Sequence, residues 1–149
     1  MGFIGGLAGA RGGVVLCEER LRSRLREGLG PWTLAGPSRE IARGALLDHP
    51  WQHAQRRRLQ AAGQRLRALL QRAGLEPEGA CALFQWVRSE RALHLQEALA
   101  AQGILVRRFG DPAGLRFGLP GSEVDWQRLE AALATVQVQG QGQGQGHDR

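Results

Sequence analysis

The succession of apolar patterns after residue 80 constrains the fold of this 149-residue chain most strongly. Residues 80–88 alternate in the manner of a strand, and residues 104–107 and 115–119 form two further short apolar runs. Ser89 and Ser122 each precede a stretch with helical apolar spacing and are suited to cap it. The resulting order of strand, helix, strand, strand and helix predicts an α/β fold of the α+β type, with helices packed on a three-stranded sheet.

Helices dominate the predicted structure before residue 80. Residues 12–17 form a short apolar run that predicts a buried strand, and a helix with leucine at every fourth position follows it. Ser38 is placed to cap a second helix. Asp48 is placed to cap the longest helix, which Gly74 ends. Residues 139–146 repeat Gln-Gly four times, and a disordered tail is predicted over residues 136–149.

All 20 basic residues are arginine, and the chain contains no lysine. This excludes Schiff-base formation, a P-loop lysine and a lysine general base within these residues. The formal net charge of +6 is compatible with nucleic acid or small anionic ligands as partners. One alternative is therefore an arginine-rich interaction module, in which the helix over residues 51–73 binds nucleic acid or an acidic partner. Because the arginines are spread along the chain, nucleic acid is the less favoured partner.

Residues that carry other chemistries are sparse. His49 and His53 have the spacing of two metal ligands on one helix face, but no third ligand accompanies them, so we predict no metal site. Cys17 and Cys81 lie in apolar runs and are interpreted as small buried side chains of a reduced, cytoplasmic protein. Neither a membrane span nor an export signal is expected, and the sequence shows no recognisable Ser-His-Asp or Cys-His catalytic arrangement.

The N-terminal segment over residues 6–12 reads Gly-Leu-Ala-Gly-Ala-Arg-Gly. Glycines allow backbone N–H groups to approach an anion, and an arginine can bind one through two hydrogen bonds. The spacing matches neither a dinucleotide-binding fingerprint nor a P-loop. By spacing alone, a flexible segment without function is favoured over an anion site.

Four segments, read in order, resemble the C-terminal part of pyridoxal-phosphate enzymes of the class I and II aminotransferase fold. Residues 6–12 resemble the run that follows the cofactor lysine. The Gly-Pro-Trp of residues 30–32, the Gly-Ile-Leu-Val-Arg of residues 103–107 and the Leu-Arg-Phe-Gly-Leu-Pro of residues 115–120 resemble three later segments. Within this family the chain is most similar to threonine-phosphate decarboxylases of cobalamin biosynthesis, and next to histidinol-phosphate aminotransferases.

The resemblance implies a division of the chain and roles for three arginines. Residues 1–17 correspond to a remnant of the large cofactor domain, an orphaned strand, and residues 18–135 to the small C-terminal domain. Arg11 is implied to contact the phosphate of pyridoxal phosphate, Arg116 to bind the anionic group of the substrate, and Arg107 to help with a substrate phosphate. Guanidinium groups suit these roles because they stay charged and bind oxyanions through paired hydrogen bonds. The implied substrate is a small phosphorylated amino acid.

Phe3 departs from the family pattern at the cofactor attachment point. In the family the cofactor lysine lies eight residues before the arginine that Arg11 resembles, and Phe3 occupies that position here. Arginine is too basic to take over the attachment. We therefore expect a truncated relative of a lyase or aminotransferase that has no catalytic residue, binds no cofactor alone and is not catalytic alone. Its expected partner is a separate large domain or a second copy of the chain.

Overall fold

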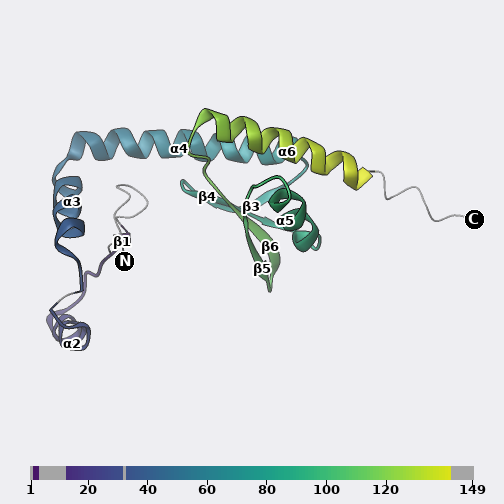
Figure 1. Cartoon of the computed structure of the whole chain (residues 1–149). Helices are drawn as coiled ribbons and strands as arrows, with labels where there is room; N and C mark the ends of the chain where they lie inside the picture. The colour runs from purple at the N-terminus through teal and green to yellow at the C-terminus, as the bar shows by residue number, and fades with distance from the viewer. Residues whose placement is uncertain (1, 4–12, 32, 142–149) are drawn as a thin grey trace, which may run out of the picture. The chain divides into compact units, whose positions relative to one another are not determined.

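The computed structural model describes residues 2–3, 13–31 and 33–141 of the chain. The chain divides into two compact units, Met1–Arg58 and Leu59–Arg149. Figure 1 shows the short helices of the first unit and the combination of sheet and helices in the second. In the described part of the chain, no helix combines the length and the hydropathy that a bilayer-spanning segment needs.

The first unit consists of helices and a minimal pair of strands. β1 (Gly2–Phe3) pairs antiparallel with β2 (Gly13–Val14). Helices α2 (Glu19–Leu29) and α3 (Gly36–Leu47) follow, and α4 (His49–Arg72) begins here and continues into the second unit. Burial is slight, since α2 buries no residue. The helices predicted for this part of the chain are therefore present, but their apolar faces remain largely exposed.

Two details of this unit differ from the sequence prediction. The buried strand expected over residues 12–17 is wrong in extent, because β2 ends at Val14 and Leu16 is 92% exposed. The strand stops where its partner does, since β1 is only two residues long. Ser38 does not cap α3, which begins at Gly36 with Pro37 in its first turn. Proline is favoured at that position because it has no backbone N–H, and an N–H in the first turn of a helix would have no partner within the helix.

Both ends of α4 form as the sequence predicts. The backbone N–H of Trp51 donates to Asp48 Oδ1 at 2.9 Å, which is the expected N-terminal cap. Gly74 follows the last turn with φ at +65°, a conformation that glycine adopts without steric cost. The helix therefore has a defined start and end, and its second half packs in the core of the second unit.

The second unit is built on a four-stranded antiparallel sheet. Its strands are β3 (Pro77–Cys81), β4 (Phe84–Arg88), β5 (Arg107–Gly110) and β6 (Ala113–Gly118). Their spatial order is β3-β4-β6-β5, and each neighbouring pair is antiparallel. Helices pack against this sheet, so the predicted α/β arrangement is confirmed.

The number of strands differs from the three that were predicted. Residues 80–88, predicted as one strand, contain the end of β3 and all of β4, joined by a turn at Ala82 and Leu83. Neither residue is of a type that marks a hairpin turn, so the alternating pattern hides the reversal of the chain. Cys81 was expected to be buried and is exposed, because it lies at the end of β3 beside this turn.

Three helices cover one face of the sheet (Figure 1). They are α4, α5 (Ala92–Ala100) and α6 (Glu123–Gln141). The predicted cap of α6 is present, since Ser122 Oγ accepts the N–H of Asp125 at 3.2 Å and Asp125 Oδ2 accepts the N–H of Ser122 at 3.1 Å. The core that these helices enclose is made of Leu66, Leu69, Leu70, Val87, Ala92, Leu95, Leu99, Leu115, Phe117, Trp126, Leu129, Ala132, Leu133 and Val136.

Helix α6 runs to Gln141, beyond the start of the disordered tail predicted over residues 136–149. The helix is already nucleated and packed by residue 136, and extending an existing helix by a few residues is far less costly than starting one. Residues 142–149, the rest of the predicted tail, lie outside the described residues.

Two ion pairs connect α4 to α6. The terminal nitrogens of Arg65 donate to the two carboxylate oxygens of Glu123 at 2.6 and 2.7 Å, and Arg72 pairs with Glu130 at 3.1 Å. Both pairs join residues 58 positions apart, so the helices run side by side in the same direction (Figure 1). The hydrogen bond from Arg65 lowers the pKa of the Glu123 carboxyl group.

Candidate functional site

The sheet of the second unit has two faces of different chemistry. Val87, Leu115 and Phe117 point toward the helices and belong to the core. Their neighbours along each strand point to the opposite side, because side chains alternate across a sheet. We name this side the outer sheet face, and no helix of the second unit covers it in the described residues. Five side chains define it: Phe84, Trp86, Arg107, Phe109 and Arg116.

Arg107 and Arg116 are direct partners across β5 and β6. Side chains of directly opposed residues on antiparallel strands lie on the same face, with Cβ atoms about 5 Å apart. Arg116 is partly buried and Arg107 is exposed. Among the described residues, neither guanidinium forms an ion pair or hydrogen bond. Two like charges thus face each other with their N–H donors available to solvent or to a ligand.

Aromatic rings lie between and beside these two arginines. The Cζ atom of Arg107 lies 5.1 Å from the centroid of the Phe109 ring. The Cζ atom of Arg116 lies 5.1 Å from the centroid of Phe84 and 6.0 Å from that of Phe109. These distances are in the range of cation–π interactions. Phe109 is therefore in contact with both guanidinium groups.

Trp86 supports Phe109 from the centre of the sheet. The two rings meet edge to face, with centroids 5.1 Å apart and an interplanar angle of 79°. The Trp86 ring lies over Gly114, where a Cβ atom would come within 2.5 Å of Trp86 Cζ2. Only glycine at position 114 leaves room for the indole in this position. The Trp86 side chain therefore belongs to the outer sheet face.

Arg108 shows that only alternate arginines reach this face. It pairs in register with the core residue Leu115, and its Nε donates to Oε1 of Gln96 on α5 at 3.2 Å. Its guanidinium is therefore directed to the helix side of the sheet. The neighbouring residues Arg107 and Arg108 therefore lie on opposite sides of the sheet.

The structure thus brings two of the three predicted arginines together. Arg107 and Arg116 meet on the outer sheet face, while Arg11 lies outside the described residues, as does Trp32. Phe109 was missed because the predicted strand over residues 104–107 is shifted in the structure, where β5 starts at Arg107 and includes Phe109. The two-residue alternation of Arg107 and Phe109 was the available signal.

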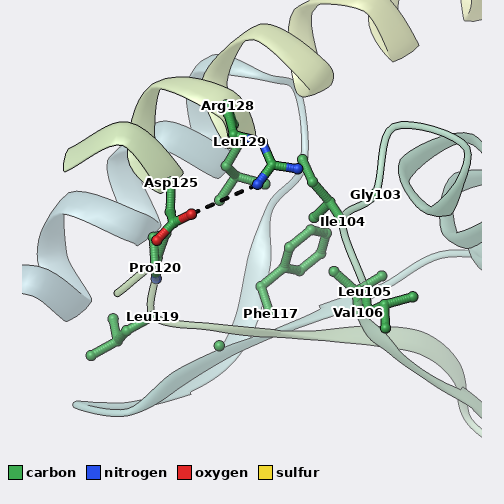
Figure 2. Close-up of a pocket in the computed structure, with 11 residues that line it drawn as sticks. Gly103, Ile104, Leu105, Val106, Phe117, Leu119, Pro120, Asp125, Arg128 and Leu129 are labelled. Carbon is green, nitrogen blue, oxygen red and sulfur yellow. Dashed lines mark ion pairs between the residues drawn. The ribbon is translucent and has the colours of Figure 1, made fainter. Parts of the chain in front are cut away.

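A cavity of about 230 Å³ opens on the other side of the sheet, next to the first turns of α6 (Figure 2). Its charged lining residues, Asp125 and Arg128, lie 3.8 Å apart. Asp125 caps α6, and Arg128 donates to the carbonyl oxygen of Gln102 at 3.5 Å. Most of the remaining lining is apolar. Because both charged groups are engaged within the protein, this cavity is a weaker candidate for ligand binding than the outer sheet face.

Two other sequence features lie on the surface of α4. His49 and His53 are exposed on α4, and no group of three metal-binding side chains gathers among the described residues. The arginines at positions 56–58 are exposed on the same helix. The alternative of an arginine-rich interaction module that binds through this helix stays a prediction.

Comparison with known proteins gives concordant matches. A sequence model of the family described as aminotransferase class I and II matches residues 4–137. The chain is 52% identical over 128 residues to a threonine-phosphate decarboxylase of Pseudomonas aeruginosa, and the match covers 86% of this chain and 39% of the relative. It is 36% identical over 133 residues to a threonine-phosphate decarboxylase of Sinorhizobium sp., with 89% of this chain and 39% of the relative covered. The chain therefore spans about two fifths of the length of these relatives.

A solved structure shares the fold. The crystal structure of a candidate aminotransferase from Burkholderia pseudomallei matches with a TM-score of 0.65 and 21% sequence identity. The match covers 79% of this chain and 37% of the other chain. At this level of identity the likeness concerns the fold alone.

Proposed function

Because the chain belongs to the class I and II aminotransferase family, we propose that its outer sheet face binds the anionic groups of a phosphorylated amino acid for a pyridoxal-phosphate-dependent decarboxylase. The names of both relatives identify threonine phosphate as the substrate of those proteins. The observation that carries the proposal is the direct opposition of Arg107 and Arg116 on β5 and β6. Arg116 would bind one anionic group, and Arg107 would help to bind the phosphate.

The physical argument rests on the charge of this pair. Like charges directly opposed across two strands destabilise a sheet, and an anion placed between them removes that repulsion. Guanidinium groups present parallel N–H donors that match the oxygens of phosphate and carboxylate groups. The donors of Arg107 and Arg116 are not engaged by any described residue, so binding an anion breaks no internal ion pair. A substrate with two anionic groups satisfies both arginines.

The residues of this chain do not fit covalently held pyridoxal phosphate. Phe3 stands in β1 at the position of the family's cofactor lysine, and the chain contains no lysine. A Schiff base needs an amine that arginine does not provide. We therefore assign no catalytic residue to this chain, and the role of Arg11 at a cofactor phosphate stays a prediction. On this proposal the chain neither holds the cofactor nor decarboxylates the substrate by itself.

The missing lysine would come from a large cofactor domain outside these 149 residues. The proposed partner is a protein or domain of that kind, and assembly with a second copy of the chain is the alternative. Copurification of the chain with a lysine-containing aminotransferase-fold partner, followed by recovery of decarboxylation on mixing, tests this part of the proposal. Decarboxylation of threonine phosphate by the purified chain with added pyridoxal phosphate would contradict it.

Titration calorimetry of the 149-residue chain with threonine phosphate tests the binding site. Charge-assisted hydrogen bonds contribute about 1.5–3 kcal/mol, so Arg116→Gln is expected to weaken binding by roughly tenfold or more. Arg107→Gln is expected to weaken binding as well. Arg108→Gln is the matched control, because it removes the same charge from the next residue of β5 on the opposite face. Equal losses in Arg116→Gln and Arg108→Gln would show that net charge, and not the outer sheet face, determines binding.

A further inference from the structure

We infer that Phe109 is a positioning residue that holds the guanidinium groups of Arg107 and Arg116 in place for a doubly charged ligand. The Trp86 ring, which packs over Gly114, in turn supports the Phe109 ring. This inference rests on the proposed function, because it concerns the same anion site. Phe109 lies 5.1 Å from Arg107 Cζ and 6.0 Å from Arg116 Cζ, so one ring contacts both cations.

The first step of the argument is the need for a support of this kind. An arginine side chain has several rotatable bonds, and ordering it on binding costs about 0.5–1.5 kcal/mol. Two opposed guanidinium groups also repel each other and would swing apart when no anion is bound. A group that orders both side chains in advance therefore increases the affinity for an anion without touching it.

The second step is that an aromatic ring orders a guanidinium without using its hydrogen-bond donors. Arg65 illustrates the other possibility: its Cζ lies 4.4 Å from the Trp126 ring, and its two terminal nitrogens also donate to Glu123. A carboxylate partner of this kind occupies the donors that an anionic ligand would need. A ring attracts the cation through its face and leaves the N–H edge free. Phe84 and Phe109 hold Arg116 in this second way.

The third step is that the Phe109 ring is itself held. Trp86 meets it edge to face, and the indole rests where position 114 has no Cβ atom. Trp86 is also the register partner of Arg116, so the support for Phe109 comes from the strand next to that arginine. The three strands β4, β6 and β5 thus contribute one connected set of side chains to the anion site.

Inorganic phosphate is the probe for the test, added to the full 149-residue chain and followed by the amide NMR shifts of β5 and β6. Phe109→Leu keeps an apolar side chain and removes the ring. A cation–π interaction at a partly exposed site predicts phosphate binding weakened by roughly three- to fivefold. Phe109→Trp restores the ring and is expected to recover affinity, which a merely structural role would not require. The preference for phosphate over acetate should fall in Phe109→Leu and return in Phe109→Trp.

Three outcomes separate this inference from the proposed function. Weaker binding in Phe109→Leu with recovery in Phe109→Trp supports the inference. Wild-type binding in Phe109→Leu together with a large loss in Arg116→Gln overturns the inference and leaves the proposed function standing. Unchanged binding in both variants overturns both. If thermal unfolding shows that Phe109→Leu does not fold, Trp86→Phe carries the test, since it loosens the support of the Phe109 ring; an affinity unchanged from wild type would then overturn the inference.

Discussion

Two arginines in the second unit each lie over an aromatic ring, but they differ in whether a carboxylate of the protein occupies their N–H donors. Arg65 lies over Trp126 and donates two hydrogen bonds to Glu123. Arg116 lies over Phe84, and no described carboxylate accepts from it. The first contact connects α4 to α6 on the helix side of the sheet. The second leaves its donors directed at the outer sheet face.

The difference teaches that the partner of an arginine, and not the arginine itself, separates a structural cation from a binding cation. Both kinds of arginine are charged at any pH the protein meets, and both rest on a ring. The N–H donors of a paired guanidinium already bond to a carboxylate of the protein, whereas those of an unpaired guanidinium can exchange water for an anion. Variants that place a carboxylate beside Arg107 and Arg116, or that remove the pair of Arg65 and Glu123, test this interpretation.

The largest effect is expected when a carboxylate is placed between the two outer arginines. In Phe109→Glu the new carboxylate replaces the ring and pairs with Arg107 and Arg116, as Glu123 pairs with Arg65. It also repels an incoming anion, so phosphate binding should weaken by about a hundredfold. Titration calorimetry measures this change.

The matched control for that variant is Val124→Glu. Val124 is 65% exposed and lies on α6, which packs on the opposite side of the sheet, so the same negative charge is added away from the outer sheet face. Its effect on phosphate binding should be small, since an exposed charge is screened by solvent and salt. Equal losses in the two variants would mean that the position of the charge does not matter.

A smaller effect is expected from filling the space over Gly114. A Cβ atom there would come within 2.5 Å of the Trp86 ring and 2.6 Å of the Val87 carbonyl oxygen, so Gly114→Ala forces the indole and the strands to move. Overpacking of this kind costs about 1–3 kcal/mol in the free energy of unfolding. Denaturant unfolding compares it with Gly118→Ala on the same strand, where no atom lies within 4 Å of the added methyl group. If both variants have the same stability, the close packing of Trp86 and Val87 over position 114 is contradicted.

The smallest effect concerns pH and belongs to the paired arginine. The hydrogen bond from Arg65 lowers the pKa of the Glu123 carboxyl group in the folded state below its ordinary value, so the folded state binds fewer protons than the unfolded one. Its stabilising contribution is present above that unfolded pKa and is lost as the pH falls through the lower folded pKa. Denaturant unfolding across acid pH should therefore show a smaller pH dependence in Glu123→Gln and in Arg65→Gln than in wild type. An unchanged pH dependence in both variants would contradict this assignment.

The sequence predicted the elements whose ends carry local signals. Asp48 and Ser122 cap α4 and α6 as expected, and Gly74 follows α4 in the expected conformation. Such caps can be predicted because the residues that form them lie within a few positions of each other. The extra strand was missed because Ala82 and Leu83 carry no turn signal, although they reverse the chain.

The candidate site could be predicted only in part. Arg107 and Arg116 were identified individually from the family resemblance, but their opposition depends on the register between β5 and β6. That register is set by the short turn between Gly110 and Ala113, and a shift of one residue would send Arg107 to the helix side. The contact of Phe109 with both arginines follows from the same register, so single-residue patterns could not reveal it.

The most direct test of the central claim is to locate the binding site of threonine phosphate on the full 149-residue chain by NMR amide shift mapping. The account predicts that the largest saturable shifts lie at Arg107, Phe109 and Arg116, and that they shrink in Arg116→Gln and persist in Arg108→Gln. Shifts confined to the cavity beside Arg128, or to the arginines at positions 56–58, would contradict the assignment of anion binding to the outer sheet face.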